Sequence, residues 1–233
     1  MSKIAIKCAS FVLPFFCFSA ANAGPINFFT EDFESFAQGP TACFGTQTLS
    51  NGWLNDTGDN LDFVADSGRT PSGSTGPNGV DSNPGSSTGK YLYMETSCNS
   101  NGNIANLLSP IFDLSARNGT GVSFAYHMYG ATIGSLHFDT SLNGGTSFTN
   151  DFEAAIVGNQ GNQWLVKTID LSQFDGEIAF RLRLRGISGA SFTGDIALDD
   201  FQFFADSTVP APATLALMGL GLAGLGWKRR RKA

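Results

Sequence analysis

The chain has 233 residues, of which 42% are hydrophobic and 15% are charged, and its formal net charge is −6. All 20 acidic residues but only seven basic ones lie between Gly24 and Thr208, so this central region carries a net charge of −13. Such a negative field repels polyanions, which excludes nucleic acid as a partner and favours cation binding. The two histidines and four cysteines form no CxxC or HExxH pattern, which argues against a structural zinc site or a zinc protease.

The N-terminus has the pattern of a secretory signal peptide. Lys3 and Lys7 accompany an apolar run that ends before Ala21-Asn22-Ala23, the small-x-small pattern read by signal peptidase. We therefore expect residues 1–23 to be removed and the folded domain to occupy residues 24–206. Only Cys43 and Cys98 then remain, and the oxidising environment outside the cytoplasm favours a disulfide between them.

Residues 55–90 consist largely of Gly, Ser, Asp, Pro and Asn. This composition predicts long, turn-rich loops without regular structure. Long loops in a β domain tend to carry function.

Beyond residue 90 the chain shows the period-two alternation of β-strands. In residues 122–129, for example, Val122, Phe124, Tyr126 and Met128 share one face. No segment of the central region has a helical period with capping residues. The pattern predicts an all-β domain, a jelly-roll β-sandwich of two antiparallel sheets, with strands at residues 90–96, 122–129, 135–141, 164–171, 178–185 and 195–204.

The strand expected at residues 178–185 places Arg181, Arg183 and Arg185 on one face, about 6.6 Å apart. These arginines form a candidate ligand-binding row for an acidic polysaccharide or a carboxylate-rich partner. The alternative, which the usual alternation of antiparallel sheets favours, is a solvated face paired with Asp or Glu on neighbouring strands.

Aromatic residues offer a second candidate surface. They could form a platform on which sugar rings stack, although aromatic residues in alternating strands more often pack in the core. The six residues considered are Trp53, Tyr91, Tyr93, Tyr126, Tyr129 and Trp164. His127 has no nucleophile in a recognisable motif, so we interpret it as structural.

Residues 207–233 differ in character from the rest of the chain. A proline-rich segment is followed by an apolar, glycine-rich run at 213–227 and a basic tail at 228–232. Fifteen helical residues span about 22 Å, short of the roughly 30 Å hydrocarbon core, so we expect a transmembrane helix that inserts briefly and is then cut. The basic tail stays cytoplasmic by the positive-inside rule. A permanent single-span anchor is the alternative.

This tail resembles the PEP-CTERM sorting signal of Gram-negative bacteria, although Ala211 replaces the Glu that names the motif. The resemblance implies recognition by an exosortase, cleavage near the proline-rich motif and release to the cell surface or the exopolysaccharide matrix. The residues that carry it are Val209, Pro210, Ala211, Pro212, Arg229, Arg230 and Arg231.

Trp53 and seven segments form an ordered pattern along the central region: Asp32-Phe33-Glu34 and residues 70–79, 89–95, 105–110, 124–130, 158–164 and 194–200. With this pattern the region resembles the MAM domain, an extracellular adhesion module. The resemblance implies a jelly roll that mediates adhesion and protein–protein contact without catalysis. Animal members typically have four cysteines, whereas only Cys43 and Cys98 remain here.

Acidic residues at these family-matching positions suggest a structural Ca²⁺ site, since Ca²⁺ takes six to eight oxygen ligands. The candidates are Glu34, Asp81, Asp199 and Asp200. The first and last strands of a jelly roll often lie side by side, so these carboxylates could converge and would then repel one another without a cation. The alternative is that they simply solvate loop ends.

Together these features predict an exported, non-enzymatic module that binds an extracellular protein or polysaccharide. One alternative is a carbohydrate-binding module in the strict sense. A less favoured alternative is a glycoside hydrolase that uses paired carboxylates such as Glu95 and Asp199.

Overall fold

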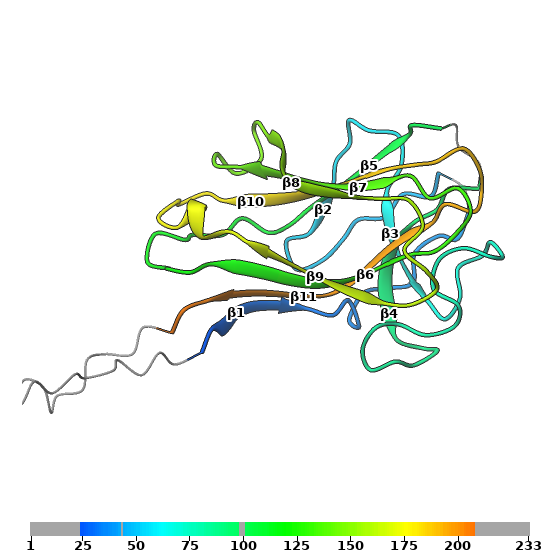
Figure 1. Cartoon of the computed structure of the whole chain (residues 1–233), viewed down its shortest axis with the longest axis horizontal. Coiled ribbons are helices and arrows are strands. Elements are labelled where there is room, and N and C mark those ends of the chain that lie inside the picture. The colour runs from blue at the N-terminus through cyan, green and yellow to red at the C-terminus, as the bar shows by residue number, and fades with distance from the viewer. Residues whose placement is uncertain (1–23, 43, 98–100, 208–233) are drawn as a thin grey trace, which may run out of the picture. The chain divides into compact units, whose positions relative to one another are not determined.

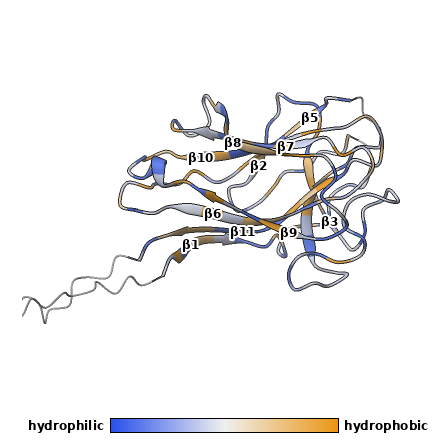
Figure 2. Cartoon of the chain, in the orientation of Figure 1, coloured by the Kyte–Doolittle hydropathy of each residue, from blue (hydrophilic) through white to orange (hydrophobic). Residues whose placement is uncertain are grey.

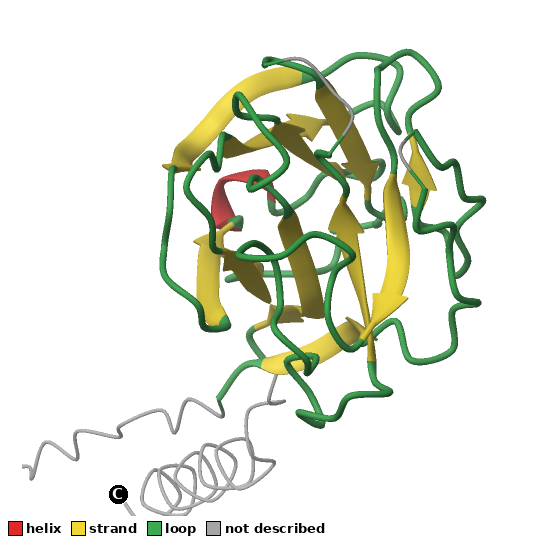
Figure 3. Cartoon of the chain, turned by 90° about the vertical axis from the view of Figure 1, so that its right-hand side faces the viewer, coloured by secondary structure: helices red, strands yellow, loops and turns green. Residues whose placement is uncertain are grey.

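The computed structural model describes residues 24–42, 44–97 and 101–207. In this part of the chain the fold is two layers of antiparallel strands (Figure 1), which confirms the prediction of an all-β domain with two antiparallel sheets. Regular helix is limited, within the same residues, to the 3₁₀ turn η1 (Ser172–Phe174). It is the red segment of Figure 3, where long loops connect the strands.

The first sheet has the strand order β3-β4-β11-β6-β9, and β1 pairs with β11 beyond this path. Its strands are β1 (Ile26–Glu31), β3 (Phe63–Ser67), β4 (Lys90–Met94), β6 (Gly121–Met128), β9 (Leu165–Asp170) and β11 (Ile196–Ala205). The pairing of β1 with β11 places the first and last strands of the domain side by side, as the sequence predicted.

The second sheet has the order β2-β5-β10-β7-β8. Its strands are β2 (Leu54–Asn55), β5 (Ile104–Leu108), β7 (Ser135–Ser141), β8 (Thr149–Val157) and β10 (Arg181–Ile187). Strands β2 and β8 are its edges, and β10 lies at its centre between β5 and β7.

The core lies between the two sheets and is built by the period-two alternation. Val122, Phe124 and Met128 of β6 point inward and are at most 1% exposed. Phe124 stacks on Phe201 of β11 with ring centroids 5.0 Å apart. Figure 2 shows hydrophobic residues concentrated along the strands of both sheets. Burial of this apolar surface, at about 25 cal/mol per Å², is the main stabilising contribution to the fold.

Two local predictions were wrong. Strand β3 lies inside the segment expected to have no regular structure, because the short run from Leu61 to Ala65 is apolar enough to be buried although polar loops surround it. The strand expected to begin at residue 178 begins at Arg181, since Ile178 is 73% exposed and lies in the preceding loop.

The loop at residues 68–89 covers the outer face of the first sheet. Gly68 accepts a hydrogen bond from the Tyr91 hydroxyl, Thr75 from the backbone of Asp195, and Val80 from the Trp164 indole. On this face Val64, Tyr91, Tyr93 and His127 are therefore buried as deeply as the core, at most 2% exposed.

Several predictions lie outside the described residues: the signal peptide, the C-terminal transmembrane helix with the sorting motif, and the Cys43–Cys98 disulfide. Within the described residues, no helix is both long and apolar enough to cross a membrane.

Candidate functional site

The first candidate site is an acidic group where β11 meets the covering loop. Pairing between β11 and β6 is regular up to Asp199 and resumes at Gln202, so a β-bulge separates the two. Within the bulge Asp200 has a positive φ of 53°, and its backbone N–H donates to Oδ1 of Asp199 at 2.8 Å. Asp199 is fully buried, and its Oδ2 accepts a hydrogen bond from the Ser82 backbone at 3.0 Å.

Asp81 reaches this group from the loop. It is 1% exposed, and its Oδ1 accepts a hydrogen bond from the Ser86 backbone. Its Oδ2 is buried and has no hydrogen-bond partner within the described residues. A side chain at residue 89 would begin 2.1 Å from this oxygen, so the carboxylate needs glycine at that position.

Charge repulsion links the four predicted ligands. Burial, and then the charge of Asp200, raises the pKa of Asp199 to about 9, and Asp81 adds to this effect. Burial and the nearby Asp81 likewise raise the pKa of Glu34, which accepts a hydrogen bond from the Lys90 backbone at 2.8 Å.

The acidic group offers oxygen ligands of the kind that Ca²⁺ prefers, including the unpartnered Oδ2 of Asp81. However, no three His, Cys, Asp or Glu side chains in the described ranges form a ready metal-binding group. The structure therefore brings the predicted residues within electrostatic range without arranging them as a coordination shell, and calcium stays a prediction.

A second acidic pair was missed by the sequence analysis. Glu95 directly follows β4, and Asp195 directly precedes β11, at the end where these two strands pair. Both side chains are buried. Burial and the charge of Glu95 raise the pKa of Asp195 to about 7, and one oxygen of each carboxylate has no partner within the described residues. Glu95 thus interacts with Asp195, whereas the hydrolase hypothesis paired it with Asp199.

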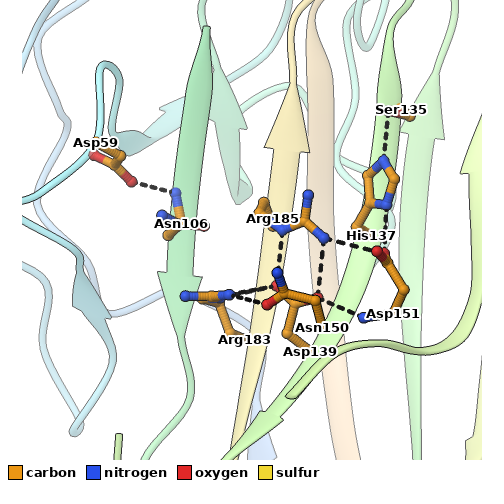
Figure 4. Close-up of polar contacts among 9 residues, drawn as sticks. All are labelled: Asp59, Asn106, Ser135, His137, Asp139, Asn150, Asp151, Arg183 and Arg185. Carbon is orange, nitrogen blue, oxygen red and sulfur yellow. Dashed lines mark hydrogen bonds and ion pairs between the residues drawn. The ribbon is translucent and has the colours of Figure 1, made fainter. Parts of the chain in front are cut away.

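The third site is the outer face of the second sheet, here called the arginine face, which consists of His137, Asp139, Asp151, Arg183 and Arg185 (Figure 4). Arg183 Nε donates to Oδ2 of Asp139 at 2.9 Å. Arg185 donates to the same carboxylate through Nε at 2.8 Å and Nη2 at 3.1 Å. Asp139 is fully buried, so two guanidinium groups share one buried carboxylate.

This arrangement reverses the effect of burial on Asp139. Burial alone would raise its pKa, but hydrogen bonds from Arg185, the Asp151 backbone and Arg183 outweigh burial and lower the pKa below its usual value. Asp139 is therefore ionised at neutral pH and neutralises part of the arginine charge.

The same face extends outward to more exposed groups. Arg185 also donates to Asp151 at 3.0 Å, and Asp151 lies 2.6 Å from Nδ1 of His137. The guanidinium of Arg183 lies 4.1 Å from the ring centroid of Phe148. Contacts within the domain therefore engage both arginines, the arrangement expected from the alternative interpretation of the row.

Arg181, the third arginine of the row, is structural. It is 9% exposed and donates to the backbone oxygens of Ser109 at 2.8 Å and Gly144 at 3.2 Å. These bonds join β10 to two loops.

The aromatic residues do not form an exposed platform. Trp53, Tyr91 and Tyr93 are fully buried, and Tyr126 is 9% exposed. His127 is 2% exposed and packs against Trp164 with ring centroids 5.5 Å apart. Burial lowers the pKa of His127 to about 4, so it is neutral at physiological pH. Packing therefore accounts for these side chains.

Comparison with known families gives two adjoining matches. A family model of the MAM domain, meprin/A5/mu, matches residues 41–207, and a model of the PEP-CTERM protein-sorting motif matches residues 208–231.

Individual relatives agree with the first match. The chain is 33% identical over 190 residues to human MAM domain-containing glycosylphosphatidylinositol anchor protein 2. The alignment covers 76% of this chain and 18% of that protein. It is also 32% identical over 192 residues to MAM domain-containing glycosylphosphatidylinositol anchor protein 1 from Rattus norvegicus. That alignment covers 80% of this chain and 20% of that protein. The chain spans at most about a fifth of these relatives.

Among solved structures, the K3 cleaved adhesin domain of Lys-gingipain from Porphyromonas gingivalis is similar in fold. Its TM-score is 0.50 at 17% sequence identity, and the match covers 78% of this chain and 99% of that one.

Proposed function

The chain belongs to the MAM domain family, and on that premise we propose that it is a surface-sorted, non-catalytic module that binds protein or polysaccharide outside the cell. A domain of this family is an adhesion or binding module. Its ligand, its processing and the absence of catalysis are the parts that we propose.

The observation that carries the proposal is the direct succession of the two family matches, residues 41–207 and 208–231. A sorting motif that begins where the binding domain ends supports export, with the apolar run 213–227 held briefly in the membrane. An exosortase-type enzyme would then cleave near Val209–Pro212 and release the domain to the cell surface or matrix.

Intact mass of the protein recovered from native surface or matrix material tests this sorting. We expect loss of residues 1–23 and cleavage near Val209–Pro212. A gain of about two daltons on reduction would also establish the predicted disulfide between Cys43 and Cys98. A chain that still ends at Ala233 would instead identify a permanently anchored adhesin.

The disposition of the polar side chains supports a non-catalytic role. The arginine face is neutralised within the domain, and Glu95 lies against Asp195. Purified protein incubated with matrix polymers should therefore retain them without turning them over. Release of reducing ends that Glu95→Gln abolishes would contradict this role and support a hydrolase.

Two treatments of the matrix fraction distinguish a protein ligand from a polysaccharide ligand. Loss of binding after protease treatment of the matrix would identify a protein ligand, and loss after periodate oxidation would identify a polysaccharide. If the chain binds neither the protein nor the polysaccharide of the untreated matrix, the proposed function is contradicted.

A structural calcium ion at Glu34, Asp81, Asp199 and Asp200 is part of the same proposal. The mutual repulsion of these carboxylates and the unpartnered Oδ2 of Asp81 support it. Such an ion would stabilise the covering loop on the first sheet.

A further inference from the structure

A cavity of about 540 Å³ opens beside β2, at one edge of the second sheet. It is lined by residues 44–49, 54, 55, 57 and 59–62, and it includes none of the residues of the acidic group or the arginine face. Its volume is within the range of sites that bind small molecules or single units of a polymer.

The walls of the cavity are held in place by side-chain bonds to the backbone. Asn55 donates to the carbonyl oxygens of Gln47 and Phe63, and its own oxygen accepts from the Phe63 N–H at 3.0 Å. Gln47 accepts from the Ala65 N–H at 2.7 Å. These bonds tie the loop to β3, so the cavity is formed without a ligand.

Two carboxylates line the cavity, and each uses one oxygen to hold the backbone. Asp59 Oδ2 accepts from the Asn106 N–H at 2.6 Å, and Asp62 Oδ2 accepts from the Gln47 N–H at 3.0 Å. Figure 4 shows the other oxygen of Asp59 pointing away from β5.

Among the described residues, the lining of the cavity contains no Lys, Arg or His, so it offers no positive charge. Burial raises the pKa of Asp59 to about 7, and the charges of Asp56 and Asp62 add to this effect. A cation in the cavity would relieve that repulsion. The two carboxylates of the described lining each already accept a backbone N–H, so a compact metal ion, which takes six to eight oxygen ligands in the case of Ca²⁺, is a poor complement.

Apolar surface borders the same cavity. Leu54 and Phe44 both line it and are 45% and 54% exposed. A sugar ring combines an apolar face of C–H groups with polar groups around its rim, so exposed apolar side chains next to hydrogen-bond acceptors match its chemistry.

We propose that this cavity binds an amino-sugar unit of an extracellular polysaccharide, with its ammonium group on Asp59 and Asp62 and its ring against Leu54 and Phe44. This inference rests on the proposed function as a binding module and adds the class of ligand.

Calorimetric titration of the full chain, purified in detergent, tests the inference. The probes are a β-1,4-linked glucosamine hexasaccharide and its N-acetylated counterpart, which differ in the ammonium group. We expect the first to bind and the second to bind at least about tenfold more weakly, because charge-assisted hydrogen bonds contribute on that scale.

Asp59→Asn should weaken binding of the glucosamine hexasaccharide about tenfold, because it removes the charge and keeps an oxygen for the Asn106 N–H. Leu54→Ala should weaken it several-fold by removing apolar contact. The matched control is Asp113→Asn, an exposed carboxylate that also accepts a backbone N–H and lies outside the cavity lining. It should change affinity less than about twofold.

Three results would overturn the inference: equal binding of both hexasaccharides, unchanged affinity in Asp59→Asn and Leu54→Ala, or equal binding of oligolysine, which would identify a general cation site. If neither hexasaccharide binds but the same preparation binds native matrix material, the inference fails and the proposed function stands. If the preparation binds no matrix component, the proposed function fails as well.

Discussion

The outer faces of the two sheets each contain a fully buried aspartate, and these two residues behave in opposite ways. On the first sheet, Asp199 is surrounded by other carboxylates, and its pKa rises to about 9. On the second sheet, Asp139 is shared by two arginines, and its pKa falls. Both are 0% exposed, so burial alone does not determine the charge of a buried acid.

The difference indicates two roles for buried acids in one domain. Asp139 completes a neutral network that joins β7 and β10, so it needs no ligand. Asp199 has like charges as neighbours and is satisfied by a proton or a cation. The arrangement around Asp199 therefore responds to pH and to cations, and the arrangement around Asp139 does not.

The largest expected effect is on the arginine face. Asp139→Ala leaves Arg183 and Arg185, whose side chains are each 13% exposed, without their shared carboxylate. We expect the free energy of unfolding to fall by about 3–5 kcal/mol, as for other broken buried ion pairs. Urea unfolding measures this loss. The exposed Asp113→Ala is the control, and an equal loss in both variants would show that the network contributes little.

Calcium should have the next largest effect, and on the first sheet only. If Ca²⁺ binds the acidic group, an excess of about 100 times its Kd adds about 2.7 kcal/mol to stability. Thermal unfolding with Ca²⁺ and with chelator measures the gain. Asp199→Asn should abolish it, whereas Asp56→Asn, another single loss of charge, should retain it. The same Tm with and without Ca²⁺ would contradict the calcium site.

In chelator, Asp199 should make stability depend on pH. Its folded pKa of about 9 exceeds its ordinary value of 3.8, so the folded state holds an extra proton between these limits and stability falls as pH rises through them. Asp59 and Asp195, with pKa values of about 7, contribute in the same direction at lower pH.

The window from pH 8 to 9 therefore isolates Asp199, with a slope of at most ~1.4 kcal/mol per pH unit. Chemical unfolding at several pH values measures this slope. Asp199→Asn should flatten it, and a slope that persists in the variant would assign the proton elsewhere.

The smallest effect is expected at the rim of the arginine face. His137→Ala removes a contact to Asp151, which is 53% exposed, so the cost should stay within about 1 kcal/mol. A double-mutant cycle with Asp151→Ala measures the coupling. A coupling well above that value would show that the rim is as important as the buried Asp139.

Sequence patterns predicted the strands in which apolar residues alternate with polar or small ones. The range expected for β7 is the one observed, and the inward residues of β6 are those predicted. Strand β3 was missed because Phe63, Val64 and Ala65 are consecutive apolar residues between polar loops, so its sequence does not alternate. Period-two reasoning depends on alternation along the sequence, and β3 has none.

The candidate sites show the same division. Family resemblance and strand order selected Glu34, Asp81, Asp199 and Asp200, which the structure brings into electrostatic contact. The importance of Asp139 had no sequence signal, because one Asp among 20 acidic residues is not distinguished by its neighbours along the chain.

By itself, the sequence determined the fold class, the family and the order of domain and sorting motif, because these depend on local alternation and on motifs read in order. Only the tertiary structure decided which charges are neutralised. Arg183 lies 44 residues from Asp139 along the chain, and strand register brings them together. The charge state of a buried group depends on neighbours within a few ångströms, and chain folding, not sequence distance, selects those neighbours.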